Sequence, residues 1–404
     1  MTRPCALKFL VINTDYPEFL HSFYRDHPGL EVQSYETQLR ARYESLFGVA
    51  DFYSSNLRRL GHEAYDIYTN NECLQYAWMR EEGIASIPSK SQLSLFQRML
   101  AAGKRVASRR PLACLEPVLR PLLNAGEQKA SSWYYAILAH QIKHYKPDVI
   151  LNQDMGGISA TFFAEMRPYY RFLIGQHAAT QLRMDASFKC YDLMISSFPP
   201  TVDYFRQQGC SAVLNRLGFE SRVLARLGPA QKKYDVALVG SFYDVHSSRV
   251  AFLNDLYAQL DRPETIKVWA PSIDHLPIES PIRGHYMGPA WGTQMYEILN
   301  ASKMTLNHHG DVPPYANNMR LYEATGVGTL LLTDWKINLS EIFTPGREVV
   351  AYRTVDECAD LIQHYLRNVE ERELVSRAGQ ERTLRQHTFL HRMQELVDVV
   401  HKYL

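Results

Sequence analysis

The chain repeats one pattern: a short apolar run rich in branched residues, then a turn, then a stretch with helical periodicity. In chain order, the first series of apolar runs is Leu7–Asn13, Asp148–Asn152, Phe172–Gly175, Leu193–Ser196 and Ala212–Leu214. The second series is Tyr234–Gly240, Ile266–Trp269, Met304–Asn307 and Thr329–Thr333. Apolar runs that alternate with helices are typical of parallel strands buried on both faces. The sequence therefore predicts two α/β domains of Rossmann type, each with a parallel sheet.

The length of 404 residues is sufficient for two such domains. We expect the boundary between Gly218 and Lys233, where glycines, a proline and charged residues precede the second series. The prediction is a first domain over residues 1–220 and a second over residues 233–385. A final helix over residues 386–404 is expected to pack back on the first domain.

Charge and cysteine content exclude several classes of protein. Lys plus Arg (44) nearly cancels Asp plus Glu (43), which argues against a nucleic-acid partner, because such binding needs a basic excess. The cysteines form no C-x-x-C pair, and no apolar run is long enough for a membrane span, so we expect a cytoplasmic protein. The amphipathic stretch 92–106 is interpreted as a packed helix. The alternative is a peripheral contact with the inner face of the membrane.

The clearest chemical signal lies in the segment Asn317–Gly328, which precedes an apolar strand. We expect a helix to begin near Asn317 and Asn318, whose side chains can cap its N-terminus. A helix N-terminus and Arg320 both suit a diphosphate. Glu323 can accept hydrogen bonds from the two hydroxyls of a ribose. The alternative is a purely structural helix–turn–strand unit.

A second signal follows the first strand of the second series. Gly240 and Ser241 allow a phosphate to approach the backbone closely, and Arg249 would lie one to two turns into the next helix. His246 could cap that helix or contact a phosphate. The alternative is an ordinary strand–helix turn.

Three candidate catalytic residues follow strands of the first domain. His177 follows Phe172–Gly175, at the strand end where ligands bind in such sheets. Asp15 and Asp154 each follow a strand and could act as a general base towards a hydroxyl group. Asp15 could equally cap the next helix, His177 could be structural, and the sequence does not choose between the two carboxylates.

A family resemblance is carried by the motif NxMRLYEATGVGTLLLTD and the preceding Asn307–Gly310 (NHHG). These residues resemble the C-terminal domain of the CgeB-like spore-protein glycosyltransferases, which are related to family four of the retaining GT-B enzymes. The segments VINTDYPEFL and YESLFGVADFYSSNLRRLGHEAYD resemble the N-terminal part of the same group. The resemblance implies a GT-B fold, in which two Rossmann-like domains face each other across a cleft.

The resemblance also implies roles for single residues. The acidic residue that binds the nucleotide ribose falls on Glu323, the glycine loop and its basic residue fall on Gly240 and Arg249, and a histidine beside the donor sugar falls on His177. The related enzymes carry a second acidic residue eight positions before the first, and here that position is Tyr315. Asp311 or the pair Asn317–Asn318 would have to serve instead.

The combined prediction is an enzyme, a retaining glycosyltransferase that moves a sugar from a nucleotide-sugar donor to a hydroxyl group. A UDP-sugar is the expected donor, and a glycan, a lipid-linked molecule or a protein is the expected acceptor. The acceptor would enter across Asp15, Tyr35, Tyr53 and His177. We expect no cofactor and no metal, because the chain has no D-x-D triplet. The alternatives are a catalytically silent binding or scaffold protein of a polysaccharide or spore-coat system, and a nucleotide-sugar epimerase.

Overall fold

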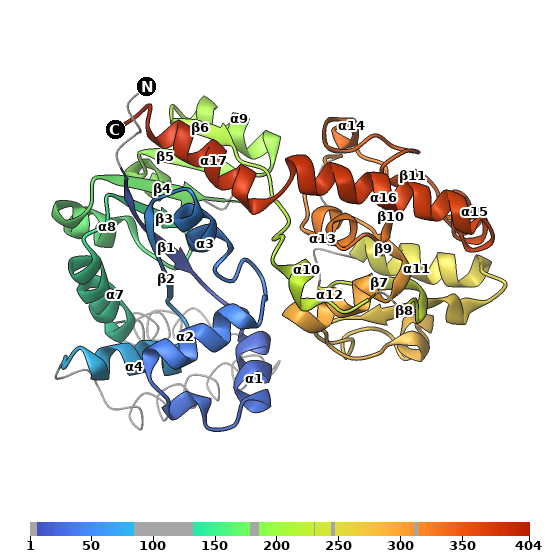
Figure 1. The fold of residues 1–404 in the computed structure, drawn as a ribbon, viewed down its shortest axis with the longest axis horizontal. Helices are drawn as coiled ribbons and strands as arrows, with labels where there is room; N and C mark the ends of the chain where they lie inside the picture. Colours follow the sequence, from blue (N-terminus) through green and yellow to red (C-terminus); the bar gives the residue numbers. More distant parts are fainter. Residues whose placement is uncertain (1–5, 85–131, 178–185, 230, 244–246, 311–313) are drawn as a thin grey trace, which may run out of the picture.

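A computed structural model describes residues 6–84, 132–177, 186–229, 231–243, 247–310 and 314–404. Figure 1 shows two lobes side by side, with the first half of the chain in blue to green and the second in yellow to red. Within the described ranges, no helix combines the length and the apolar character needed to cross a membrane.

The first lobe is built around a six-stranded parallel sheet. In spatial order its strands are β2 (Glu63–Tyr68), β1 (Lys8–Asn13), β3 (Val149–Asn152), β4 (Phe172–Gln176), β5 (Leu193–Ser196) and β6 (Ala212–Leu214). The helices of this lobe are α1 (Pro17–Asp26), α2 (Tyr35–Glu44), α3 (Phe52–Arg59), α4 (Glu72–Glu81), α7 (Ser132–Tyr145), α8 (Ala160–Met166) and α9 (Pro199–Gln207). Short 3-10 turns lie at Leu30–Val32, Arg167–Tyr169 and Ala186–Cys190.

The second lobe contains a five-stranded parallel sheet. In spatial order its strands are β11 (Val350–Tyr352), β10 (Leu330–Asp334), β9 (Ser302–Asn307), β7 (Tyr234–Val239) and β8 (Ile266–Trp269). The remaining helices are α10 (Val223–Arg226), α11 (Ser247–Gln259), α12 (Gly292–Asn300), α13 (Arg320–Gly326), α14 (Leu339–Ile342), α15 (Val355–Arg367), α16 (Val369–Gln386) and α17 (Phe389–Val400). The 3-10 turns are Pro263–Thr265 and Pro281–His285.

Each sheet is buried on both faces, as the continuous apolar runs predict. Alternate residues of the first sheet pack with α3 and α17 on one face, and with α7, α8 and α9 on the other. In the second sheet, α11 and α15 cover one face, whereas α12 and α13 lie on the other. The predicted two-domain parallel α/β architecture is thereby confirmed. The edge strands β2 and β11 were not predicted.

Two segments connect the lobes and lie next to each other. The linker residue Phe219 makes two backbone hydrogen bonds at the break between α16 and α17. Its amide donates to the carbonyl of His387, and its carbonyl accepts from the amide of Phe389. Beyond this break α17 crosses to the first lobe, where the ring of Phe389 packs against Phe52 and Tyr53 of α3. Figure 1 shows this final helix in red above the first sheet.

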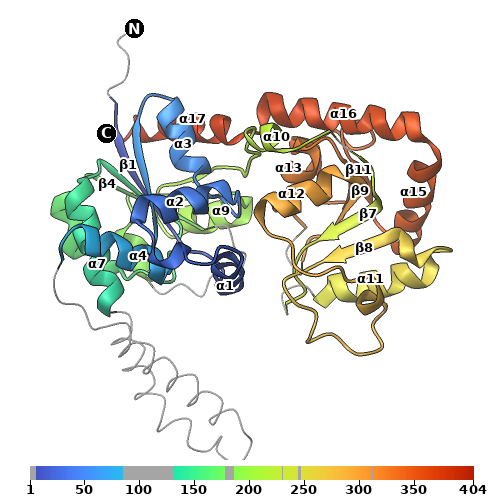
Figure 2. The same ribbon diagram turned by 60° about the horizontal axis from the view of Figure 1, so that its bottom comes forward.

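Loops at the carboxyl ends of both sheets contact each other between the lobes. The Tyr243 hydroxyl, after β7, donates to Glu18, after β1, at 3.4 Å. The ring of Phe198, after β5, lies 5.7 Å from that of Tyr315, after β9. In Figure 2, β7 and β8 point toward the first lobe. The two carboxyl edges therefore face each other, the arrangement in which α/β folds bind ligands.

Candidate functional site

Three loops of the second lobe meet at the carboxyl edge of its sheet, because β7, β9 and β10 are neighbours. The turn Gly240–Ser241 follows β7, and the amide of Gly240 donates to the carbonyl of Trp269 at the end of β8. A Cβ on Gly240 would lie 3.1 Å from Nη1 of Arg249, so a larger residue would crowd that guanidinium. The Arg249 side chain therefore packs directly against this turn.

The Arg249 guanidinium is buried and donates to backbone carbonyls. Nη1 donates to Ser241 O at 2.6 Å, while Nε and Nη2 donate to His308 O at 3.0 and 2.7 Å. The side chain thus ties the loop after β7 to the loop after β9. The guanidinium thereby shapes the turn, and its expected contact with a diphosphate stays a prediction. His246, in the same segment, lies outside the described residues.

Helix α13 begins at Arg320, later than expected. Its N-cap is Met319, and no side chain caps it. The expectation that Asn317 and Asn318 cap the helix is wrong, because Asn318 instead donates to Asn307 Oδ1 at 2.8 Å. This bond links the start of α13 to the end of β9. Asp311, the other proposed substitute for the missing acidic residue, lies outside the described residues.

Arg320 and Glu323 form an ion pair on the first turn of α13. Nη1 of Arg320 lies 2.9 Å from Oε2 of Glu323, and the two side chains are only 12% and 8% exposed. Burial raises the pKa of Glu323, and the Arg320 charge opposes that rise. Nη2 of Arg320 also donates to Val239 O at 3.1 Å, the residue before Gly240. The two predicted nucleotide-binding segments are thus in direct contact.

A histidine and a carboxylate at the ends of neighbouring strands form a pair that sequence reasoning missed. His309 Nδ1 lies 2.6 Å from Asp334 Oδ1, which also accepts from the His309 amide, and Lys336 lies 3.1 Å from Oδ2. Burial alone would raise the pKa of Asp334. The His309 hydrogen bond and the nearby positive charges instead hold that pKa well below its usual range. A signal was available, because His309 follows β9 directly and Asp334 ends β10.

Asp15 is a partner in a buried ion pair of the first lobe. Both of its carboxylate oxygens accept from the Arg42 guanidinium, with Arg42 Nε at 2.9 Å from Oδ2, and both side chains are 2% exposed. The N-cap of α1 is Tyr16, without a side-chain bond. The expectation that Asp15 caps α1 is therefore wrong, and its expected role as a general base stays a prediction.

Asp154 and His177 follow the neighbouring strands β3 and β4. The Asp154 carboxylate accepts from the Gly157 amide at 2.9 Å, and burial raises its pKa. The His177 amide donates to the carbonyl of Ile195, and its ring meets that of Phe205 edge-on. The raised pKa of Asp154 is a shift in the direction that favours proton transfer near neutral pH.

The two tyrosines expected on the acceptor side lie inside the first lobe. Tyr53 is 2% exposed, and its hydroxyl accepts from Gln176 Nε2 at 2.9 Å. Tyr35 packs with Trp78 and Ile137, and burial raises its pKa well above the usual value. Tyr53 is thus a packing residue and Tyr35 a partly buried one, and the expected acceptor-side role of both stays a prediction. The amphipathic stretch 92–106 lies outside the described residues.

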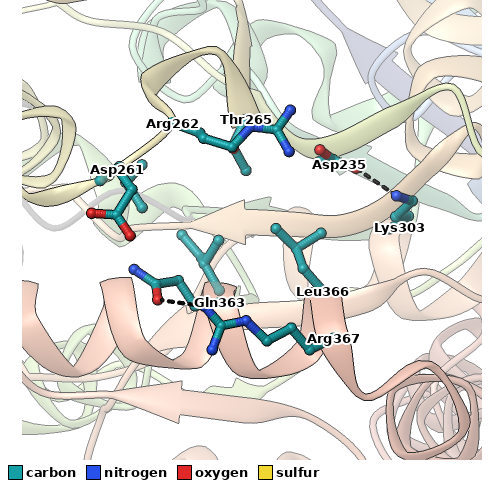
Figure 3. Close-up of a pocket in the computed structure, with 10 residues that line it drawn as sticks. Asp235, Asp261, Arg262, Thr265, Lys303, Gln363, Leu366 and Arg367 are labelled. Atoms are coloured by element: carbon teal, nitrogen blue, oxygen red, sulfur yellow. Dashed lines mark hydrogen bonds and ion pairs between the residues drawn. The ribbon is translucent and has the colours of Figure 1, made fainter.

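Two cavities lie in the described part of the protein. A crevice of about 640 Å³ is lined by residues of both lobes, including Phe23 of α1 and Trp291 before α12. Figure 3 shows a smaller cavity of about 390 Å³, where Lys303 and Asp235 pair at 2.6 Å. The smaller cavity lies at the amino ends of β7 and β9, opposite the three loops. It is therefore separate from the candidate site.

Comparisons with known proteins agree with this architecture. Residues 224–398 match the family model "Glycosyl transferase-like". No curated protein sequence matches the chain. Among solved structures, HepE of Anabaena in complex with UDP-glucose has a TM-score of 0.58 at 11% identity, with 98% of this chain and 100% of that chain covered.

Two further structures are similar over the whole chain. A glycosyltransferase from Rickettsia africae has a TM-score of 0.55 at 9% identity, with 98% of this chain and 97% of that chain covered. Sucrose-phosphate synthase from Thermosynechococcus elongatus has a TM-score of 0.51 at 10% identity, with 98% and 99% covered. The fold is therefore GT-B, and residues 224–398 are similar to the glycosyl transferase-like family.

Proposed function

We propose that this protein transfers a sugar from a nucleotide-sugar donor, a UDP-sugar, to a hydroxyl group of an acceptor. The observation that carries the proposal is the contact between Arg320 and the Val239 carbonyl at 3.1 Å. It joins the first turn of α13 to the turn Gly240–Ser241. Backbone amides, a guanidinium and the Glu323 carboxylate are thereby gathered at one sheet edge, and these groups suit a diphosphate and a ribose.

The HepE structures support UDP as the nucleotide, because they contain UDP-glucose, UDP with glucose, or UDP alone. The CgeB-like resemblance supports transfer with retention of configuration. In front-face attack, the bond from the sugar carbon to the diphosphate breaks while the acceptor hydroxyl attacks. The proton then passes to the departing phosphate or to a base, and the candidate base is Asp154, which follows β3 and whose pKa is raised by burial.

The donor diphosphate carries negative charge that must be stabilised as it leaves. Backbone amides at the Gly240–Ser241 turn and the Arg320 guanidinium can supply this stabilisation without a metal ion. We expect full turnover in excess chelator. Loss of turnover that is restored by Mg²⁺ or Mn²⁺ would contradict the metal-free part of the proposal.

The direct test is a binding and turnover screen with UDP-, GDP- and dTDP-sugars. A ligand at about 100 times its dissociation constant should add about 2.7 kcal/mol to stability, which thermal unfolding detects. The proposal expects UDP-sugars to stabilise the protein and UDP to be released much faster when a hydroxyl acceptor is present than by hydrolysis alone. Sugar conversion without an acceptor would instead indicate an epimerase.

One observation favours the second candidate function, a catalytically silent binding protein. Glu323 is already paired with Arg320, so a ribose would have to compete for that carboxylate. In that case a UDP-sugar would bind, but neither transfer to an acceptor nor slow hydrolysis would follow. Product analysis over long incubations separates the two functions.

A further inference from the structure

The His309 side chain is a buried group whose second ring nitrogen is unused. His309 is 2% exposed, and its Nε2 has no hydrogen-bond partner within the described part of the chain. Leaving a buried polar atom unsatisfied typically costs about 1–3 kcal/mol. Such exceptions in a folded protein call for an explanation, and one explanation is a role in binding a ligand.

The chemistry of this nitrogen follows from its partner. Asp334 Oδ1 lies 2.6 Å from His309 Nδ1 and also accepts from the His309 amide. Because the neighbouring positive groups hold the pKa of Asp334 low, Asp334 is a carboxylate and cannot donate, so Nδ1 carries a proton. In the neutral tautomer with its proton on Nδ1, the Nε2 atom is an acceptor and is directed away from Asp334. It suits a hydroxyl group.

The position of His309 identifies where that hydroxyl would come from. The preceding carbonyl, His308 O, accepts two bonds from the same Arg249 guanidinium that holds Ser241 O. The His309 loop and the Gly240–Ser241 turn are therefore fastened together by one side chain. A sugar attached to a diphosphate at this turn would extend over the neighbouring strand ends, which places its hydroxyls within reach of the His309 loop.

We propose that His309 Nε2 accepts a hydrogen bond from a hydroxyl of the donor sugar, and that Asp334 positions the ring. This inference rests on the proposed function and adds the sugar-binding residue to it. The Nε2 atom is covered in the absence of ligand. A small shift of the surrounding side chains on binding would expose it, and the new bond would remove the cost of the unsatisfied atom. The site would select sugars that carry the contacted hydroxyl over deoxy sugars.

His308 provides a matched control one residue away. Its ring stacks on Phe252 at 4.4 Å between centroids, and its Nδ1 contacts the Tyr352 hydroxyl at 3.1 Å. Its side chain therefore has structural partners, and only its backbone carbonyl contacts Arg249. His308→Phe keeps the ring stacking and the carbonyl.

The test is calorimetry with UDP and with UDP-glucose, UDP-galactose and UDP-N-acetylglucosamine. The measured quantity is the affinity gain, defined as the ratio of the dissociation constant of UDP to that of the tightest-binding UDP-hexose. We expect His309→Phe to lower this gain at least tenfold while the UDP affinity stays within twofold. His308→Phe should leave both values unchanged. If His309→Phe does not fold, Asp334→Asn serves instead, with an expected loss of at least threefold.

UDP-hexoses that lack single hydroxyl groups provide a second test of the same hydrogen bond. For the wild type, removing the contacted hydroxyl from the UDP-hexose should weaken binding at least tenfold, whereas the same removal should have little effect in His309→Phe. An unchanged affinity gain in the folded variant would overturn the inference while leaving UDP binding intact. Absence of UDP and UDP-hexose binding to the wild type would overturn the proposed function as well.

Discussion

The carboxyl edges of the two sheets face each other, but their charged side chains have different partners. At the first edge, the Asp15 carboxylate is held by the Arg42 guanidinium, and both side chains are buried. At the second edge, Arg249 and Arg320 donate to backbone carbonyls of the surrounding loops, including Ser241 O. The ion pair at the first edge fastens a helix to the sheet. The guanidinium-to-carbonyl hydrogen bonds at the second edge, beside the Arg320–Glu323 ion pair, fasten the loops that would hold a ligand.

A charged residue at the end of a strand is therefore not by itself evidence of a functional role. Asp15 and Asp154 both follow strands of the first sheet and look equivalent in the sequence. In the structure Asp15 is part of the scaffold, whereas burial raises the pKa of Asp154 and no buried guanidinium holds it in the described residues. The partner, rather than the residue type, separates the two roles.

The largest expected effect comes from breaking the scaffold pair of the first edge. Arg42→Met leaves the buried Asp15 carboxylate without its partner, and such a loss typically costs about 3–5 kcal/mol. Urea unfolding should show this loss, while UDP affinity of the folded fraction should stay within twofold. Adding Asp15→Leu should recover much of the stability. A loss below about 1 kcal/mol would show that the pair is not structural.

A smaller effect is expected at the candidate base. Asp154→Asn should lower kcat about 100-fold, the lower end for general-base catalysis, and leave UDP affinity unchanged. Because the pKa of Asp154 is raised, wild-type kcat should fall as the pH drops through a value above the usual range of aspartate. The variant should lack this limb of the pH profile. A loss below threefold would mean that the departing phosphate takes the proton.

At the second edge, Glu323→Gln should weaken UDP binding about 30-fold, or about 2 kcal/mol, because a charged acceptor for the ribose is lost. Calorimetry measures the change. Glu341→Gln is a matched control, since Glu341 pairs with Arg216 near the protein surface at 2.8 Å. Equal UDP affinity in the Glu323 variant and the wild type would remove Glu323 from the site and leave its pair with Arg320 structural.

The last expected effect is on the pH dependence of the stability of the first lobe. Burial raises the pKa of Asp66 from 3.8 to about 7, although a hydrogen bond from Ser54 opposes the rise. The folded state then binds more protons than the unfolded state between these values, so the free energy of unfolding falls as the pH rises from about 4 to about 7. Asp66→Asn removes this titration, so the variant should gain at most about 4 kcal/mol over the wild type at pH 8 and nothing below pH 4. An equal gain at both pH values would contradict this account.

The sequence predicts every strand except β2 and β11, which lie at one edge of each sheet. Strands buried on both faces, such as β3 and β10, are continuous apolar runs and are recognisable without the structure. Strand β2 alternates between exposed and buried residues at its start, so it gives no continuous apolar run. Strand β11 has only three residues and was also missed.

The sequence predicts which segments form the candidate site, but it does not predict which side chains contact each other there. The order of strands and glycines indicates the turn Gly240–Ser241 and the helix that carries Glu323. The partners of Asp15, Arg249 and His309 are 27, 59 and 25 residues away in the chain. Such pairings depend on strand order and side-chain packing, which local sequence patterns do not contain.

The most direct test of the central claim is a crystal structure of the protein with UDP bound. We expect the diphosphate against the turn Gly240–Ser241 and the Arg320 guanidinium, and the ribose within hydrogen-bonding distance of Glu323. Density for UDP elsewhere, for example in the cavity beside Asp235 and Lys303, would contradict the account.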